Sequence, residues 1–139
     1  MPGRNDVLGG GGIHHVAMNV PDFDASVAFY TEVLGCTEAH RWGEGDKQAV
    51  LLDTGDGSYI EIFPGGKPGD TDNRLLHVAL RSGDVDAAIE RVRSAGAEVT
   101  AEPTDVNIPC DPPLPVRIAF CKGPAGEIIE FFHDRSAGA

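Results

Sequence analysis

The chain contains an internal repeat: the stretch 15-HVAMNVPDFDA-25 returns, altered, as 77-HVALRSGDVDA-87. Both copies read His-Val-Ala, an apolar residue, three variable positions and then Asp-x-Asp-Ala. The far ends repeat as well, because 57-GSYIEIF-63 aligns with 126-GEIIEFF-132 and each copy carries a glutamate at the same point. This repetition predicts two similar structural modules, each with a histidine near its start and a glutamate near its end.

The first copy predicts a strand over 13–20 that Pro21 stops, and then a helix. Asp22 and Asp24 are candidate N-caps, and Gly35 is the helix stop. The helix is expected to bury a stripe formed by Val27, Tyr30 and Leu34. Two further strands are expected over 49–55 and 58–63, separated by the turn-forming residues 54–58.

The second copy repeats this order, with a first strand over 75–80 and a helix that Asp84 or Asp86 caps and Gly96 ends. Three strands follow, at 97–101, 115–120 and 127–132. The repeating unit is therefore βαβββ, used twice, and the expected fold class is α+β. The two tandem modules are expected to form a curved mixed sheet around a central metal cleft.

A chain of 139 residues suits one compact domain. Residues 1–12 end in four glycines and are expected to form a flexible N-terminal tail. The domain is expected over 13–133, with module one at 13–64, a linker at 65–73 and module two at 74–133. Residues 134–139 are expected to form a C-terminal tail.

The formal charge of −11 argues against binding to nucleic acid or to an anionic membrane surface. No apolar run approaches the roughly 20 residues that span a bilayer, and no leader segment precedes the domain, so a cytoplasmic protein is expected. Cys36, Cys110 and Cys121 have no paired spacing and are expected to be free thiols.

Four side chains recur at equivalent positions of the repeat: His15 and Glu61 in the first copy, and His77 and Glu130 in the second. Strand residues alternate between faces, so each glutamate shares its face with aromatic or aliphatic neighbours. One interpretation places both glutamates on a solvent-facing surface, because carboxylates are seldom buried without a partner. The other brings all four residues around one point, where two imidazoles and two carboxylates suit a divalent metal ion.

The repeat favours His15 over its neighbour His14 as a ligand, because His15 aligns with His77 whereas His14 aligns with Leu76. We expect His14 to lie beside the ligands or at the surface. His40 and His133 have no counterparts in the other copy and receive no role.

These motifs resemble the vicinal oxygen chelate superfamily, which includes glyoxalase I, methylmalonyl-CoA epimerase, extradiol dioxygenases and antibiotic-sequestering proteins. The resemblance covers residues 13–133 and rests on three segments: HVAMNVPDFDASVAFYTEVLG, the HVAL strand with its Asp-x-Asp helix, and GPAGEIIEFF. It implies metal ligands at His15, Glu61, His77 and Glu130, a set similar to that of bacterial-type glyoxalase I. It also implies a homodimer.

The expected function is that of a metal-dependent lyase or isomerase of the glyoxalase I type, which transfers a proton on a small oxygenated substrate. Glu130 and Glu61 are both candidates for the catalytic base. The expected cofactor is one divalent ion, and nickel, cobalt, zinc, manganese and iron all suit these ligands.

Three alternatives remain open. An extradiol dioxygenase uses two histidines and one carboxylate, so a fourth protein ligand counts against that class. A metal-free sequestering protein would not need the complete ligand set. In an epimerase of this family, a glutamine commonly takes the place that Glu61 has here.

Glyoxalase I, which these motifs resemble, holds the carboxylates of glutathione with basic residues. No motif places such residues in this chain, and the candidates are Arg41, Lys47, Arg74, Arg117 and Lys122. The proline-rich segment 103-PTDVNIPCDPPLP-115 is expected to be extended or turned and not to form a helix or an inner strand. It is a candidate wall or lid of the metal cleft.

Overall fold

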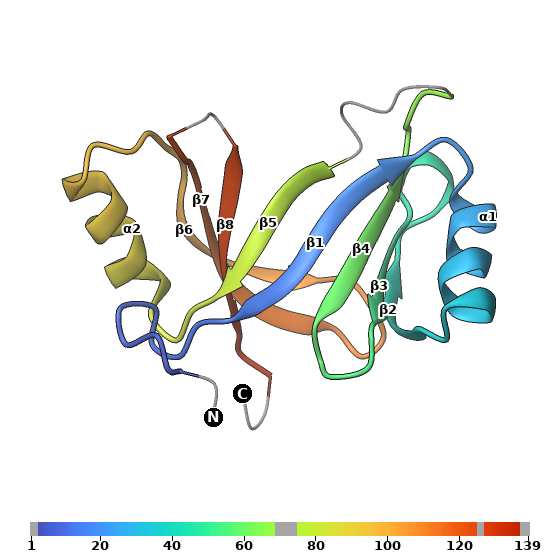
Figure 1. Ribbon diagram of the computed structural model, residues 1–139, viewed down its shortest axis with the longest axis horizontal. Helices are drawn as coiled ribbons and strands as arrows, with labels where there is room; N and C mark the ends of the chain where they lie inside the picture. The colour runs from blue at the N-terminus through green and yellow to red at the C-terminus, as the bar shows by residue number, and fades with distance from the viewer. Residues whose placement is uncertain (1–2, 69–74, 125–126, 137–139) are drawn as a thin grey trace. The chain divides into compact units, whose positions relative to one another are not determined.

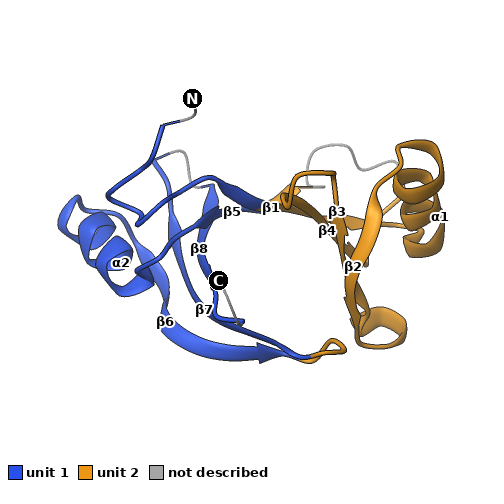
Figure 2. Ribbon diagram, turned by 90° about the horizontal axis from the view of Figure 1, so that it is seen from below, with its two compact units in different colours: residues 1–14, 77–108, 113–139 blue, residues 15–76, 109–112 orange. Residues whose placement is uncertain are grey.

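The computed structural model describes residues 3–68, 75–124 and 127–136, in which the chain forms two βαβββ modules (Figure 1). The fold class is α+β, as predicted. The chain divides into two compact units, which are coloured separately in Figure 2. Unit 2 comprises residues 15–76 with 109–112, and unit 1 comprises residues 1–14, 77–108 and 113–139. The predicted linker at 65–73 falls largely outside the described residues.

The first module contains four strands and one α-helix, in the order β1 (Ile13–Val20), α1 (Phe23–Ala28), β2 (Thr37–Trp42), β3 (Ala49–Asp53) and β4 (Tyr59–Pro64). The sheet order is β2-β3-β4-β1. The first and last strands of the module, β1 and β4, lie side by side and parallel, whereas β2–β3 and β3–β4 are antiparallel. The predicted βαβββ unit includes a strand between the first helix and β3, but sequence analysis assigned no residues to it. This strand is β2.

The second module repeats this arrangement with β5 (Leu75–Arg81), α2 (Val85–Ser94), β6 (Val99–Ile108), β7 (Leu114–Lys122) and β8 (Ile128–Asp134). Its sheet order is β5-β8-β7-β6. The first and last strands, β5 and β8, are again parallel neighbours, and the other two pairs are antiparallel. Each module therefore brings its opening strand against its closing strand.

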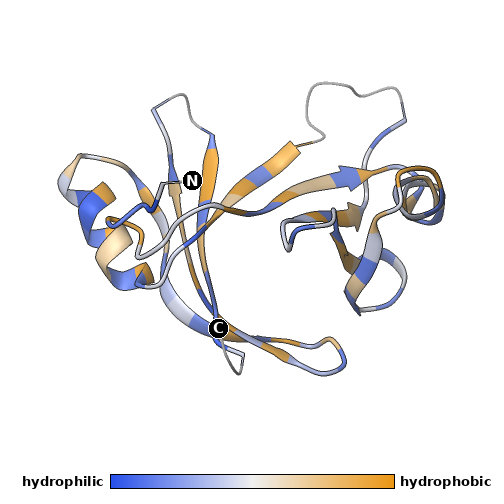
Figure 3. Cartoon of the chain, turned by 60° about the horizontal axis from the view of Figure 1, so that its bottom comes forward, coloured by the Kyte–Doolittle hydropathy of each residue, from blue (hydrophilic) through white to orange (hydrophobic). Residues whose placement is uncertain are grey.

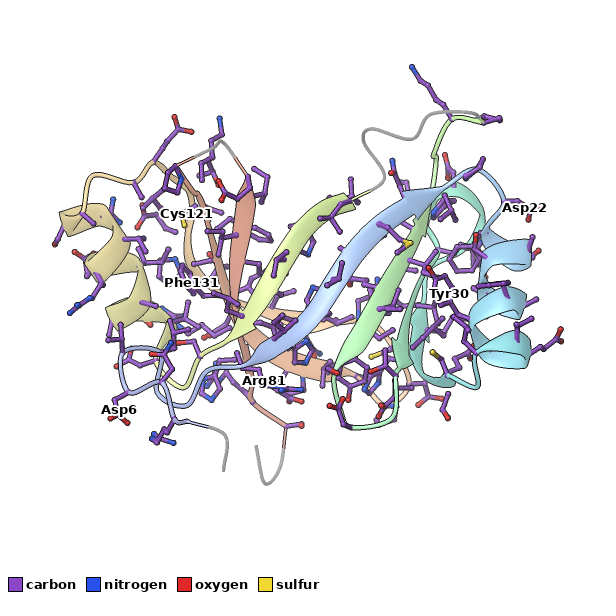
Figure 4. The ribbon with its side chains drawn as sticks, viewed as in Figure 1. Asp6, Asp22, Tyr30, Arg81, Cys121 and Phe131 are labelled. Atoms are coloured by element: carbon purple, nitrogen blue, oxygen red, sulfur yellow. The ribbon has the colours of Figure 1, made fainter. Side chains whose placement is uncertain are left out.

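In each module, the helix packs on one face of its own sheet. The core of unit 2 lies between α1 and the strands and includes Phe23, Val27, Val50, Leu52 and Ile62, with Tyr30 packed against it (Figure 4). In unit 1 the equivalent layer lies beneath α2 and includes Val85, Ile89, Ala119, Cys121 and Phe131 (Figure 4). Figure 3 shows the hydrophobic stretches concentrated in the strands and on part of α2.

The predicted N-caps are confirmed at both helices. The Asp22 side chain accepts a hydrogen bond from the backbone N–H of Ala25 at 3.0 Å, and Asp84 accepts one from Ala87 at 2.9 Å. Each cap satisfies a backbone donor that the first helical turn leaves without a partner. The two modules thus start their helices in the same way.

The stripe predicted for the first helix is wrong at Leu34, which is 58 % exposed. After Ala28 the helix widens into a π-helical turn over Phe29–Val33, in which the N–H of Leu34 reaches the carbonyl of Phe29. A π turn changes the angular step between residues, so the 3.6-residue period no longer places Leu34 beside Val27. Gly35 ends the turn with a φ of +76°, as the stop signal predicted.

Residues 3–12 belong to unit 1 and contact its other segments. Asn5 and Gly10 form an isolated antiparallel bridge, and the carbonyl oxygens of Leu8 and Gly12 accept hydrogen bonds from Gly83 and Arg81 at 2.8 Å each. The Leu8 side chain packs against the core beneath α2. The four glycines at 9 to 12 allow the backbone to follow this course, because all four have positive φ values. Residues with a Cβ atom rarely adopt such values.

The proline-rich segment is extended over its first half, as predicted, because Pro103–Ile108 belongs to β6. A register shift between Ala101 and Thr104 accommodates Pro103. The expectation against an inner strand is wrong at Pro115, since this residue lies in β7, which pairs with both β6 and β8. It is tolerated near the start of the strand, where its carbonyl accepts a hydrogen bond from Arg135 at 2.8 Å.

The three cysteines are free, as predicted. Burial raises the pKa of the Cys121 thiol, so this residue is a weak candidate for a nucleophile. Cys110 is buried, with its Sγ 3.3 Å from the carbonyl oxygen of Pro112 and 3.8 Å from Nδ1 of His40. Among the described residues, no helix is long and apolar enough to span a membrane.

Replacing Asp84 by alanine is expected to lower the free energy of unfolding by about 1 kcal/mol, because the α2 cap is lost. Asp84→Asn keeps an acceptor oxygen and should retain most of the stability. Urea unfolding of both variants measures the difference. Equal losses in the two variants would contradict a capping role.

An ion-pair network ties α2 to the far strands of unit 1. Arg117 contacts Asp86 at 2.7 Å and Asp105 at 3.0 Å, and Arg135 contacts Asp105 at 2.7 Å. Hydrogen bonds from Arg117 lower the pKa of Asp86, and those from Arg117 and Arg135 lower the pKa of Asp105. The network is therefore complete above the ordinary aspartate pKa of 3.8 and is lost as the pH falls below it.

We expect Arg117→Gln to be less stable than the parent at pH 6, with the difference shrinking as the pH falls from 4 toward 2. The reason is that the two aspartates lose the charge that Arg117 stabilises. Urea unfolding at a series of pH values measures this. A difference that stays constant across that range would show that the network contributes no charge-dependent stability.

Candidate functional site

The two parallel strand pairs have equivalent registers, and these registers position the residues of the candidate site. In the first module Ala17 lies opposite Glu61, two residues after His15. In the second module Ala79 lies opposite Glu130, two residues after His77. A period of two keeps the histidine and the alanine on one face of their strand. Each histidine is thus the diagonal neighbour of the glutamate of its own module.

In each module the histidine and glutamate meet directly. Nε2 of His15 lies 3.3 Å from Oε1 of Glu61, and Nε2 of His77 lies 3.0 Å from Oε1 of Glu130. The alanine between them is fully buried in both modules. Because an alanine projects only a methyl group, the imidazole can reach across it to the carboxylate.

Both glutamates are buried on the sheet face away from their own helix. Their neighbours Ile62 and Phe131 pack beneath α1 and α2, so the glutamates point to the opposite side. Even so, Glu61 is only 6 % exposed and Glu130 only 4 %. The interpretation that placed these carboxylates on a solvent-facing surface is therefore wrong.

Large apolar residues flank each carboxylate on its second side. Leu51 lies opposite Glu61 in the β3–β4 register, and Phe120 lies opposite Glu130 in the β7–β8 register. Phe120 also meets the His77 ring edge-on, with the ring centroids 5.7 Å apart. Each pair therefore lies in an apolar setting, where charge interactions are strengthened and an uncompensated charge is costly.

His14 is buried, with 5 % exposure, and its ring stacks on Phe132 with centroids 4.0 Å apart. Both residues belong to unit 1. Phe132 is two residues after Glu130 and shares its face. Sequence analysis placed His14 either beside the ligands or at the surface, and the surface alternative is wrong because the ring is buried. Neither periodicity nor the repeat predicts a stacking partner.

The described basic residues that were considered for glutathione are mostly engaged elsewhere. Arg41 pairs with Glu38 at 2.6 Å, and its guanidinium carbon lies 5.4 Å from the centre of the Phe23 ring on the helix side of unit 2. Arg117 belongs to the ion-pair network, and Lys122 pairs with Glu98 at 3.2 Å. Lys47 lies on a short 3-10 turn, Gly45–Lys47, and Arg74 lies outside the described residues.

Comparison with known proteins identifies the family. The profile of the Glyoxalase/Bleomycin resistance protein/Dioxygenase superfamily matches residues 12–131, and the chain belongs to this superfamily. Its relatives include enzymes of more than one kind. A probable lactoylglutathione lyase from Vibrio parahaemolyticus is 31 % identical, over 95 % of this chain and 97 % of that protein.

A 2-epi-5-epi-valiolone epimerase from an Actinomyces species is 31 % identical, over 76 % of this chain and 70 % of that protein. Among solved structures, methylmalonyl-CoA epimerase from Mycobacterium tuberculosis aligns with a TM-score of 0.68 at 24 % identity. The alignment covers 88 % of this chain and 87 % of that one. The structural likeness shows that the fold is shared.

Removing one partner of a buried pair should destabilise the metal-free protein. His77→Ala leaves the Glu130 carboxylate without the imidazole 3.0 Å away, which should cost about 1–3 kcal/mol of unfolding free energy at pH 7. Glu130→Gln keeps the shape and removes the buried charge, and it should cost less. Urea unfolding of chelator-treated protein compares the two. A His77→Ala variant as stable as the parent would show that the pair contributes nothing.

Proposed function

We propose that the chain is a metal-dependent enzyme of the lyase or isomerase type, which transfers a proton on a small oxygenated substrate as glyoxalase I does. The observation that carries the proposal is the duplicated buried pair. One histidine and one glutamate meet in each module, at equivalent register positions and on the sheet face away from the helix of that module. A structural role alone gives no reason to bury a carboxylate twice in this way.

We propose further that His15, Glu61, His77 and Glu130 hold one divalent metal ion together. The donor set fits such an ion, because neutral imidazole nitrogens and carboxylate oxygens suit nickel, cobalt, zinc, manganese and iron. Burial also fits, since a cation offsets the cost of desolvating two carboxylates. The duplicated βαβββ fold and membership of the superfamily support this arrangement.

When bound, the ion would supply Lewis-acid stabilisation to a substrate oxygen next to the reacting carbon. The protein's own contribution is a base within reach of that carbon. Glu61 and Glu130 are both candidates, because each has a carboxylate oxygen in an apolar setting that excludes competing water. The alanines at 17 and 79 are small enough for each histidine to reach the carboxylate of its own module on the same face.

The named activities of the relatives, lyase and epimerase, agree with this chemistry. Both activities can proceed by moving a proton at a carbon beside a carbonyl group. The dioxygenase members of the superfamily need open positions for oxygen as well as substrate, and a fourth protein ligand would occupy one of them. We therefore favour proton transfer over oxygen chemistry for this chain.

The test is the metal content of tag-free protein purified without chelator, measured by plasma mass spectrometry. We expect about one divalent ion per chain, in line with one shared site. A His77→Ala, Glu130→Ala double variant should retain none. Arg41→Ala, Glu38→Ala is the matched control, because it removes an exposed ion pair and should leave the metal content unchanged.

If the parent holds no metal even after incubation with nickel, cobalt, zinc and iron, the enzyme proposal fails and a metal-free binding protein becomes the better account. Iron content with oxygen uptake in the presence of catechols would favour the dioxygenase class instead. Both outcomes differ clearly from the predicted one, which is one divalent ion bound to all four residues without oxygen uptake.

A further inference from the structure

The sheet face around the His77–Glu130 pair is apolar. On β7, Ala119 and Cys121 pack beneath α2, so Ile118 and Phe120 point to the other face. The same alternation on β8 places Ile128 and Phe132 on the face of Glu130. The β7–β8 register sets Phe120 opposite Glu130 and Ile118 opposite Phe132. The carboxylate is therefore surrounded by aromatic and branched aliphatic side chains.

Part of this apolar surface is accessible. Phe132 is buried under the His14 ring, but Ile118, Phe120 and Ile128 are each partly exposed. Phe120 is held by its edge-on contact with His77, which fixes the ring next to the proposed metal ligand. We call Ile118, Phe120 and Ile128 the apolar wall. It lies within unit 1 and adjoins the proposed site.

Cations on the described strands of unit 1 do not line this wall. Arg117 points to the helix side, where it binds Asp86 and Asp105. Lys122 shares the parity of Phe120, but it lies at the strand end and binds Glu98. Arg81 shares the parity of His77 and lies opposite Phe132, at the end of β5 (Figure 4). Its guanidinium lies beside Gly12 and not beside the apolar wall. The formal charge of −11 adds a general repulsion of anions.

We propose that the substrate is an uncharged, metal-chelating carbonyl compound with an apolar, ring-sized substituent that packs on the apolar wall. This inference rests on the proposed function and makes its substrate class specific. It disfavours substrates that are held by carboxylates or phosphates, including glutathione adducts and CoA esters. Such groups would have to be desolvated beside Ile118, Phe120 and Ile128, where the described strands of unit 1 supply no compensating cation.

Three hydroxamates test the proposal, because a hydroxamate chelates a metal through two adjacent oxygens without turning over. Acetohydroxamate reports chelation alone, benzohydroxamate adds a phenyl ring, and 4-carboxybenzohydroxamate adds a charge to that ring. Calorimetry on the nickel-loaded full chain gives the three dissociation constants. We expect benzohydroxamate to bind at least about tenfold more tightly than acetohydroxamate, because the ring removes apolar surface from water. The carboxylate should cancel most of that gain.

Two variants locate the effect. Phe120→Ala and Ile118→Ala should each reduce the preference for benzohydroxamate and leave acetohydroxamate binding within about twofold, since the chelating residues are intact. Ile118→Ala is needed beside Phe120→Ala because Phe120 also contacts His77. Phe29→Ala is the matched control, since Phe29 is a half-exposed phenylalanine on the helical turn of unit 2 and should change neither constant.

The outcomes separate the two proposals. If acetohydroxamate does not bind the nickel-treated protein, the metal site fails, and the apolar wall fails with it. If acetohydroxamate binds but benzohydroxamate shows no preference, only the substrate inference is overturned. If 4-carboxybenzohydroxamate binds most tightly, the inference is also wrong. Loss of that tight binding in Arg81→Ala would then identify the cation that recognises the anion.

Discussion

The positions of the two histidine–glutamate pairs depend on one constraint, which is the parallel pairing of the first and last strands within each module. Parallel pairing makes residues at the middle of two strands into neighbours although they are distant in the sequence. It sets His15 diagonally from Glu61 and His77 diagonally from Glu130, with a small alanine between them. In each module the helix covers one face of the strands and leaves the other face for these side chains.

The second consequence is electrostatic. Each glutamate is flanked by an alanine and by a large apolar residue, and each is almost fully buried. A carboxylate in such a place is costly unless another group compensates for its charge. The imidazole of the same module provides part of that compensation, at 3.3 Å and 3.0 Å. The proposed metal ion would provide the rest, and it would draw on all four donors.

Much of this was predictable from the sequence because the chain repeats. The repeat identified the βαβββ modules and both N-caps. It also paired each histidine with a glutamate at the same relative position. By contrast, the pattern missed β2, whose residues Thr37–Trp42 are mostly exposed and polar and so carry little periodic signal.

The remaining differences between the predicted and the observed structure arise from features that hydrophobic periodicity and composition do not report. The π turn moved Leu34 out of the buried stripe, and the stack of His14 on Phe132 joins residues more than a hundred positions apart. The segment 3–12 has the composition of a tail, yet its backbone hydrogen-bonds to residues 81 and 83. Composition reports the cost of ordering such a segment, but it does not reveal the partner that orders it.

The central claim is that both modules contribute to a single metal ion. Pulsed electron paramagnetic resonance on copper-loaded protein tests it most directly, because the echo modulation counts the imidazoles bound to each ion. The account predicts two imidazoles per ion in the parent and one in either His15→Ala or His77→Ala. One imidazole per ion in the parent, or a count that neither substitution changes, would contradict a shared site.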